Sequence, residues 1–207
     1  MSSSRIKRKA HMNKIESGME QRFKDSTEDT PKIKVWKLKL EEFKTYKNDY
    51  FKLIDQRDSA EQTRREATEN ATDSKAELIK TLKQTNNSVL SVISEDDVKY
   101  KEFVKTKTIA QITSLPAGEL VESAKHYSAV AKKNIGSGIN QEIVTKLENS
   151  IDKYNKSLSA SQAANINEDK LIKLLQKTDV EADKVIKKIL LYIESEVTTE
   201  EFNNYFD

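Results

Sequence analysis

The chain contains no cysteine, and its 207 residues include only four glycines, two prolines and one tryptophan. Without cysteine there is no disulfide, no thiolate metal site and no thiol nucleophile. Compact α/β folds need many tight turns, which Gly and Pro usually make. Their scarcity therefore favours a few long elements over many short ones.

Long apolar runs are also missing. The longest uninterrupted run is ILLYI at residues 189–193, far below the roughly 20 residues that a transmembrane helix needs. The N-terminal residues are basic and are followed by no apolar segment, which excludes the pattern of a secretory signal peptide. The sequence predicts a cytoplasmic protein, and a virion-associated location also fits.

Charged residues are abundant, at 34% of the chain against about 25% in typical domains, and the mean hydropathy is −0.75. Long helices with a narrow buried stripe and wide solvated faces have this composition. The net charge of +2 is unevenly placed, because residues 1–24 carry +5 and residues 189–207 carry −5. Only six of the 36 basic residues are Arg, the residue best suited to bidentate phosphate recognition.

Aliphatic and aromatic residues recur every three or four positions from Trp36 onward, and no Gly or Pro lies between residues 32 and 115. The pattern predicts one long helix over about 38–93, about 80 Å in length. Its central stripe consists of small residues, so residues 55–75 form either a close contact within the subunit or an exposed arm. A loop near 70–74 would instead divide the helix into a hairpin. The alternating segment KIKVWKLKL at 32–40 is interpreted as an entry from extended backbone into this helix near residues 35–38, with Trp36 anchoring one end of the bundle. Ile33 and Val35 lie outside the helical stripe, so they pack either on their own bundle or on a neighbouring subunit.

Further helices are predicted along the rest of the chain. Ser94 is a candidate cap for a helix over 95–113, and Pro116 suits the first turn of the next helix. Residues 134–138 form a stop signal, after which Asn140 caps another helix. A kink at 165–167 separates this helix from a last one over 168–197.

The predicted fold is all-α: an elongated bundle of four to six helices with a long antiparallel pair. The pair is expected to cross where both helices have small residues, at 60–71 and 159–164. Residues 1–31 are assigned to a flexible tail, 32–198 to the bundle and 199–207 to an acidic aromatic segment. The dipeptide His11-Met12 also fits a cloning scar, which would remove any biological meaning from the basic residues before it. A faint echo between 77–86 and 170–179 raises the alternative of an internal duplication.

No catalytic pattern is evident. The two histidines, His11 and His126, are far apart, and the acidic pairs are adjacent residues that point to different faces of a helix. A Glu-x-x-His pair for a di-metal site, a phosphate-binding glycine loop and a nucleophile elbow are all missing from the sequence. We therefore expect a protein that is not an enzyme and that uses no metal and no cofactor.

Two terminal segments and one aromatic residue are the candidate interaction sites. A C-terminal helix would gather three aromatic side chains on one face, and the N-terminus carries a basic cluster; the residues are Phe202, Tyr205, Phe206, Arg5, Lys7, Arg8, Lys9 and Trp36. The sequence predicts a structural or scaffolding subunit of a virion, a filament or a cytoplasmic scaffold. Its partner is a second copy or another protein, and a head-to-tail contact between the oppositely charged ends is one arrangement. The alternative is a nucleic-acid-associated accessory protein that uses the basic arm.

Overall fold

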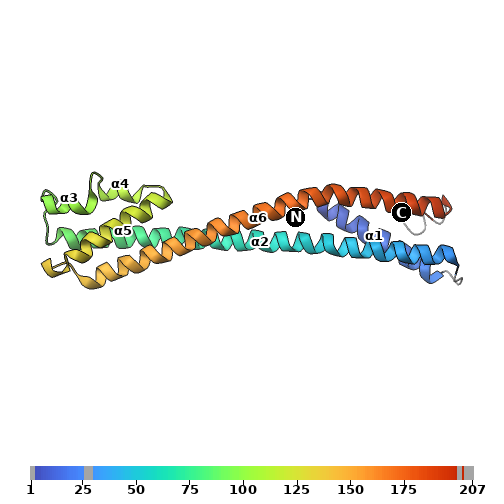
Figure 1. The fold of residues 1–207 in the computed structure, drawn as a ribbon, viewed down its shortest axis with the longest axis horizontal. Coiled ribbons are helices and arrows are strands. Elements are labelled where there is room, and N and C mark those ends of the chain that lie inside the picture. The colour runs from blue at the N-terminus through green and yellow to red at the C-terminus, as the bar shows by residue number, and fades with distance from the viewer. Residues whose placement is uncertain (1–2, 26–29, 200–201, 203–207) are drawn as a thin grey trace. The chain divides into compact units, whose positions relative to one another are not determined.

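The computed structural model describes residues 3–25, 30–199 and 202, and the regular structure in these residues is entirely helical (Figure 1). The elements are α1 (Ser3–Asp25), α2 (Pro31–Leu90), α3 (Val98–Val104), α4 (Ile109–Thr113), α5 (Ala117–Lys133), the short 3-10 helix η1 (Ile135–Ser137) and α6 (Gln141–Glu196). The all-α class and the long antiparallel helix pair, α2 and α6, are confirmed.

The chain divides into two compact units. Unit 1 consists of residues 1–61 and 167–207, and unit 2 consists of residues 62–166. Each unit therefore receives one half of α2 and one half of α6, and each adds its own further helices. The single bundle domain expected over 32–198 is in this respect replaced by two units.

Helix α2 is continuous over 60 residues, as the lack of Gly and Pro predicts. It begins at Pro31, a residue suited to the first helical position because its missing N–H has no intrahelical partner there. The expected entry from extended backbone near residues 35–38 is wrong, because α2 already begins at Pro31. The alternation of Lys with apolar residues places Trp36 and Leu40 in the core and leaves Val35 and Leu38 exposed.

Unit 1 is a bundle of α1 with the N-terminal half of α2 and the C-terminal half of α6. Contacts of Trp36 with Tyr192 and of Tyr50 with Asp179 show that α2 and α6 run antiparallel here. The core combines three residues of α1 with residues of the other two helices: Met12, Ile15, Met19, Trp36, Leu40, Phe43, Tyr50, Ile54, Leu175, Ala182, Ile186, Ile189 and Ile193.

The flexible tail expected over 1–31 is wrong for residues 3–25, which form α1. Met12, Ile15 and Met19 are spaced by three and four residues and are at most 1% exposed. Three buried core positions among 23 residues give too weak a periodicity to distinguish a helix from a charged tail. Helix α1 also forms ion pairs with α2 and α6, and the residues that make these pairs are distant in sequence.

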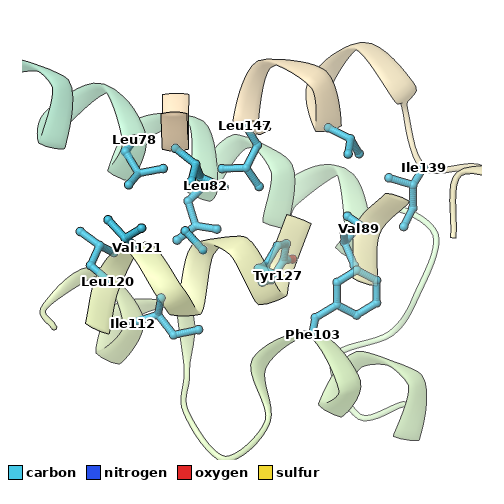
Figure 2. Close-up of a cluster of buried hydrophobic side chains, with 14 of the residues drawn as sticks. Leu78, Leu82, Val89, Phe103, Ile112, Leu120, Val121, Tyr127, Ile139 and Leu147 are labelled. Atoms are coloured by element: carbon cyan, nitrogen blue, oxygen red, sulfur yellow. The ribbon is translucent and has the colours of Figure 1, made fainter. Parts of the chain in front are cut away.

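Unit 2 places α3, α4 and α5 against the other halves of α2 and α6. Figure 2 shows Leu78 and Leu82 from α2, Leu147 from α6 and Tyr127 from α5 gathered in one cluster with Phe103 and Ile112. Two tyrosine hydroxyls in this core, those of Tyr100 and Tyr127, donate to Oδ1 of Asn86 at 2.7 and 2.9 Å. The buried polar groups are thereby satisfied without charge.

The connections of unit 2 differ from expectation at one point. The single helix expected over 95–113 is divided into α3 and α4, because the chain turns at Lys105, whose φ is +53°. Asp97 caps α3 in place of Ser94, and Thr108 forms a capping box with Gln111 at the start of α4. Asn140 accepts the N–H groups of residues 142 and 143, as predicted, and Gly138 has a φ of +103° that favours glycine.

Helix α6 is continuous over 56 residues, so the kink expected at 165–167 is wrong. Its small residues meet those of α2 within unit 2, where Thr68 lies 3.4 Å from Ser161 and Thr81 lies 3.1 Å from Ser150 between their hydroxyl oxygens. Ser74 likewise contacts Ser157. Small side chains on both helices let the two backbones approach closely, and their hydroxyls bond to each other.

Candidate interaction surface

The predicted basic cluster lies on α1 and is largely occupied by contacts within unit 1. Arg5 binds Asp179 of α6 at 3.0 Å, and Arg8 binds both Asp179 and Asp183. Lys9 lies 3.3 Å from Asp55 of α2. Three of the four basic side chains thus connect α1 to its neighbours, and only Lys7 remains fully exposed.

Arg8 is the centre of this network. Its guanidinium donates to both oxygens of Asp183, at 2.7 and 2.8 Å, and to the hydroxyl of Tyr50 at 3.1 Å. The hydrogen bonds to Arg8 lower the pKa of Asp183 and those to Asp183 raise the pKa of Arg8. Burial, together with the hydrogen bond to Asp179, raises the pKa of Tyr50 to about 12. Such a bidentate, charge-assisted arrangement orients α1 as well as attracting it.

Ion pairs also line the side of α1 that faces α2. Glu16 pairs with Lys47, and Glu20 pairs with Lys44 at 2.8 Å. The seam therefore has acids of α1 facing bases of α2, while Arg5 and Arg8 of α1 face acids of α6 and Lys9 faces Asp55 of α2. The acids that pair with the basic cluster lie outside the acidic segment 189–207.

Trp36 is in the core rather than on a surface. It is 5% exposed, and its ring centre lies 5.6 Å from that of Tyr192. The guanidinium of Arg22 lies 4.7 Å from the same ring centre, a cation–π distance. This agrees with its interpretation as an anchor at one end of the bundle, and it excludes Trp36 as an exposed docking residue.

The C-terminal aromatic residues are placed only in part. Phe202 is half-buried and packs against the core of unit 1. Tyr205 and Phe206 lie outside the described residues. The aromatic cluster predicted for this segment is thus represented in the structure by Phe202 alone.

A face of unit 1 that the sequence did not reveal carries an apolar groove. The groove lies between α2 and α6, has a volume of about 290 Å³, and is lined by Phe43, Tyr46, Val185, Ile189 and Tyr192 with Lys39, Glu42 and Lys188 at its rim. We call this side of unit 1 the open face. It differs from the side where Lys44, Lys47, Asp179 and Asp183 bind α1.

Exposed apolar side chains extend the open face beyond the groove. Val35 and Leu38 are 45% and 59% exposed, and Leu174 is 49% exposed. Leu53, seven residues after Tyr46 and therefore on the same side of α2, is half-buried. Burial, with a contribution from the charge of Glu181, raises the pKa of Tyr46 to about 12. Large apolar groups gathered around a groove are typical of a surface that packs against another chain.

The halves of α2 and α6 in unit 2 meet through polar groups instead. The Thr81–Ser150 and Ser74–Ser157 hydroxyl contacts lie between them, and Lys153 of α6 pairs with Glu77 of α2. This interface satisfies its own polar groups. The apolar groove described above lies between the halves of the two long helices in unit 1.

The remaining candidate residues form no chemical site. His126 is half-buried, and its Nε2 lies 2.8 Å from the carbonyl oxygen of Glu102. It borders a hollow of about 630 Å³ beside the turn at Lys105, with Lys107 and Lys125 nearby. Lys125 pairs with Glu122 in the same helix. Among the described residues, no three His, Asp or Glu side chains come close enough together to bind a metal ion.

Comparison with known proteins gives no relative: no family model, no curated protein and no solved structure matches the chain. Within the part of the chain that the structure describes, no helix is both long enough and apolar enough to cross a membrane. The physical properties of the two units are thus the basis for a functional proposal.

Proposed function

We propose that the protein is a non-enzymatic structural or scaffolding subunit that packs the open face of unit 1 against helices of a neighbouring molecule. The observation that carries this proposal is the apolar groove between α2 and α6 together with the exposed Val35, Leu38 and Leu174 around it. Water contact with these groups is unfavourable, and their burial would contribute about 25 cal/mol for each Å² of apolar surface removed from water.

The alternative of a nucleic-acid-binding arm has less support. Arg5, Arg8 and Lys9 are engaged with Asp179, Asp183 and Asp55. Phosphate binding by these groups would have to compete with the contacts that attach α1. A structural role for the basic cluster accounts for its charge without a polyanionic partner.

The experiment is sedimentation velocity of the whole chain from about 1 µM to about 100 µM. Assembly that grows with concentration and is lost in Val35→Lys and Leu38→Lys supports the proposal. Both residues are exposed, so these substitutions should leave the helicity and the melting temperature unchanged. Val98→Lys is the matched control, because Val98 is 74% exposed but belongs to unit 2. The proposal is contradicted if the chain is a monomer at every concentration, or if the open-face substitutions do not weaken its assembly.

Deletion of residues 199–207 tests the role predicted for the C-terminal segment in the same assay. Lower mass than the whole chain at equal concentration would show that this segment contributes to assembly. An unchanged mass would restrict assembly to the helical surface.

A further inference from the structure

The outer face of α6 in unit 1 carries a row of exposed lysines. They follow one another at intervals of three, four or seven residues, a spacing that keeps them on one side of the helix: Lys170, Lys173, Lys177, Lys184 and Lys187. We call these five residues the lysine row. Among the residues that the structure describes, none of the five side chains forms an ion pair or a hydrogen bond.

The lysine row lies opposite the core of unit 1. Two residues along an α-helix correspond to a rotation of about 200°. Lys173 and Lys177 are each two residues from the buried Leu175, and Lys184 is two residues from the buried Ala182. The row therefore faces solvent, between the side of α6 that binds α1 and the side that forms the open face.

Three lysines of α2 in the same unit show a different arrangement. Lys39, Lys44 and Lys47 each pair with a glutamate of unit 1, so their charge is matched within the protein. Asp169 and Glu181 lie on the flanks of the lysine row, and neither of them pairs with it in the structure described. The five lysines outnumber these two acids, so the row keeps a net positive charge for an outside partner.

Apolar side chains interrupt the lysine row. Val180 and Leu191 are both 55% exposed, and each continues the three- and four-residue spacing of the lysines. From Lys170 to Leu191 the row is about 32 Å long. A straight, basic helix face that also exposes apolar side chains is typical of a surface that lies on a membrane.

One end of the lysine row meets α1 at a hollow of about 560 Å³. Lys7 of α1, Lys187 and the apolar Leu191 border this hollow. Two acids border it as well: Asp183, whose charge is already matched by α1, and Glu194. The exposed Lys7 thus extends the basic surface from α6 onto α1.

We propose that the lysine row binds the surface of a bilayer that contains anionic lipids. The lysine ammonium groups then lie at the lipid phosphates, while Val180 and Leu191 enter the headgroup region. Lysine suits this position because its long aliphatic stem lies along apolar surface while its charge stays in water. The inference goes beyond the proposed function, since it uses a different face of unit 1 and needs no neighbouring molecule.

Nucleic acid is the other polyanion that a lysine row attracts, and its shape fits less well. Each strand of B-DNA winds around the duplex once in about 34 Å, so a straight row of similar length follows a strand over only part of its course. A single strand can bend, but sites for single strands stack the bases on aromatic side chains, and the row contains none. A flat bilayer meets every residue of a straight row.

Co-sedimentation of the whole chain with vesicles tests the proposal. Vesicles of phosphatidylcholine alone are compared with vesicles in which about 30% of the lipid is phosphatidylserine. We expect binding to the anionic vesicles only, because each lysine near such a surface raises the affinity about fivefold. Raising the ionic strength from about 0.1 M to about 1 M should release the protein.

A triple variant reverses three charges of the row: Lys173→Glu, Lys177→Glu and Lys184→Glu. Its affinity for the anionic vesicles should fall by more than about 100-fold. Because these side chains are exposed and make no ion pair, circular dichroism and the melting temperature should be unchanged.

The matched control makes the same change in net charge at exposed lysines of unit 2: Lys80→Glu, Lys83→Glu and Lys156→Glu. Its affinity should stay within about twofold of the unaltered chain. A second variant, Val180→Ser with Leu191→Ser, keeps the charge of the row. It should bind the anionic vesicles about tenfold more weakly, because its apolar contact with the bilayer is lost.

The outcomes decide the proposal. Binding to anionic vesicles that the row variant loses and the unit 2 control keeps supports it. Equal loss in both triple variants, full affinity of the serine variant, or no binding at about 0.1 M salt overturns it. Binding of a duplex or single-stranded oligonucleotide by the row, without binding to vesicles, also overturns it and assigns the row to nucleic acid. Sedimentation without vesicles reports assembly through the open face, so the proposed function stands or fails separately.

Discussion

The two units complete the same pair of long helices in different ways. Unit 1 adds α1, whose buried apolar residues are Met12, Ile15 and Met19 and whose edges carry ion pairs to α2 and α6. Unit 2 adds α5, which buries Leu120, Val121, Ala124, Tyr127 and Ala131. Helix α5 is thus attached mainly by apolar burial, whereas α1 depends on charge. We therefore expect the attachment of α1 to weaken with salt and that of α5 to be unaffected.

The tyrosine hydroxyls of the two units show the same difference between charged and neutral partners. In unit 1 the hydroxyl of Tyr50 donates to Asp179 at 2.6 Å, and two arginines neutralise that carboxylate. In unit 2 two tyrosine hydroxyls donate to the neutral Asn86. Asn86 and Asp179 occupy matching positions in the weak echo between 77–86 and 170–179. The same tyrosine-to-acceptor geometry is therefore made with a neutral amide in one unit and with a charged network in the other.

The largest effect is expected from Leu120→Ala. Leu120 is fully buried in unit 2, and its truncation should lower the free energy of unfolding by about 2–5 kcal/mol. Chemical denaturation at low and at high salt should give the same loss, because no charge is involved. Val98→Ala, at an exposed position, is the control and should change stability by less than about 0.5 kcal/mol. A loss that depends strongly on salt would break the distinction between the units.

The next effect is expected from Asn86→Asp. This change puts a carboxylate in the core of unit 2 with no cation beside it, and should cost about 1–3 kcal/mol at neutral pH. Burial would raise the folded-state pKa of the new acid, so the penalty applies where the acid is ionised and disappears as the pH falls. Denaturation as a function of pH should show this recovery. A free energy of unfolding that does not change across the acidic range would indicate that water reaches the site.

Asp179→Asn is the reciprocal change, with a somewhat smaller expected effect. It keeps an acceptor for Tyr50 but removes the charge that faces Arg5 and Arg8, at a cost of about 1–2 kcal/mol. Hydrogen exchange should accelerate in α1 and stay unchanged in α5. Asp169→Asn, the same chemical change at an exposed position of α6, is the control. Equal acceleration in α5 would show that the two units do not respond separately.

Salt should produce a smaller change without any substitution. Raising the ionic strength from about 0.1 M to about 1 M shortens the Debye length from about 10 Å to about 3 Å. The ion pairs of α1 are partly exposed, so we expect amide exchange in α1 to rise by about threefold while α5 is unaffected. Exchange measured by mass spectrometry resolves the two helices, and identical responses would contradict a charge-dependent α1.

The smallest effect is expected from acid. The hydrogen bonds to Arg8 keep the folded-state pKa of Asp183 below its ordinary value of 3.8. Stability from this pair is therefore fully present above about pH 4 and is lost as the pH falls through the lower folded-state pKa. Exchange in α1 should be constant from pH 7 to pH 5 after correction for the intrinsic rate, and should rise only below pH 4. A rise already at pH 6 would require a different titrating group.

The sequence predicted the continuity of α2 and the start of α6, since their causes are local. The lack of Gly and Pro between residues 32 and 115 predicts the continuity of α2, and the Asn140 side chain caps α6 as expected. The sequence does not predict the division of the helix expected over 95–113, because the turn is made at Lys105 and no glycine marks it. Helix α1 was missed because its stability comes from Asp55, Asp179 and Asp183, which are 46 to 175 residues away.

The candidate interaction surface was likewise predicted only in part. The sequence pointed to Trp36, the basic cluster and the terminal aromatics, because these residue types are conspicuous. The structure buries Trp36, engages Arg5, Arg8 and Lys9 internally, and shows the groove of the open face instead. The only advance signal for that groove was the position of Ile33 and Val35 outside the helical stripe. Helix α1 covers one face of the α2–α6 pair in unit 1, so its position decides which face stays exposed.

The sequence by itself determined that the chain is all-α, that it contains a pair of long helices, and where α6 begins. These properties follow from backbone propensity, caps and apolar spacing over a few residues. Only the tertiary structure decided that a polar N-terminal segment becomes a helix, that the helix pair is shared between two units, and that one face of unit 1 is apolar. Those outcomes depend on contacts between side chains that are more than a hundred residues apart. Local sequence patterns do not predict such contacts.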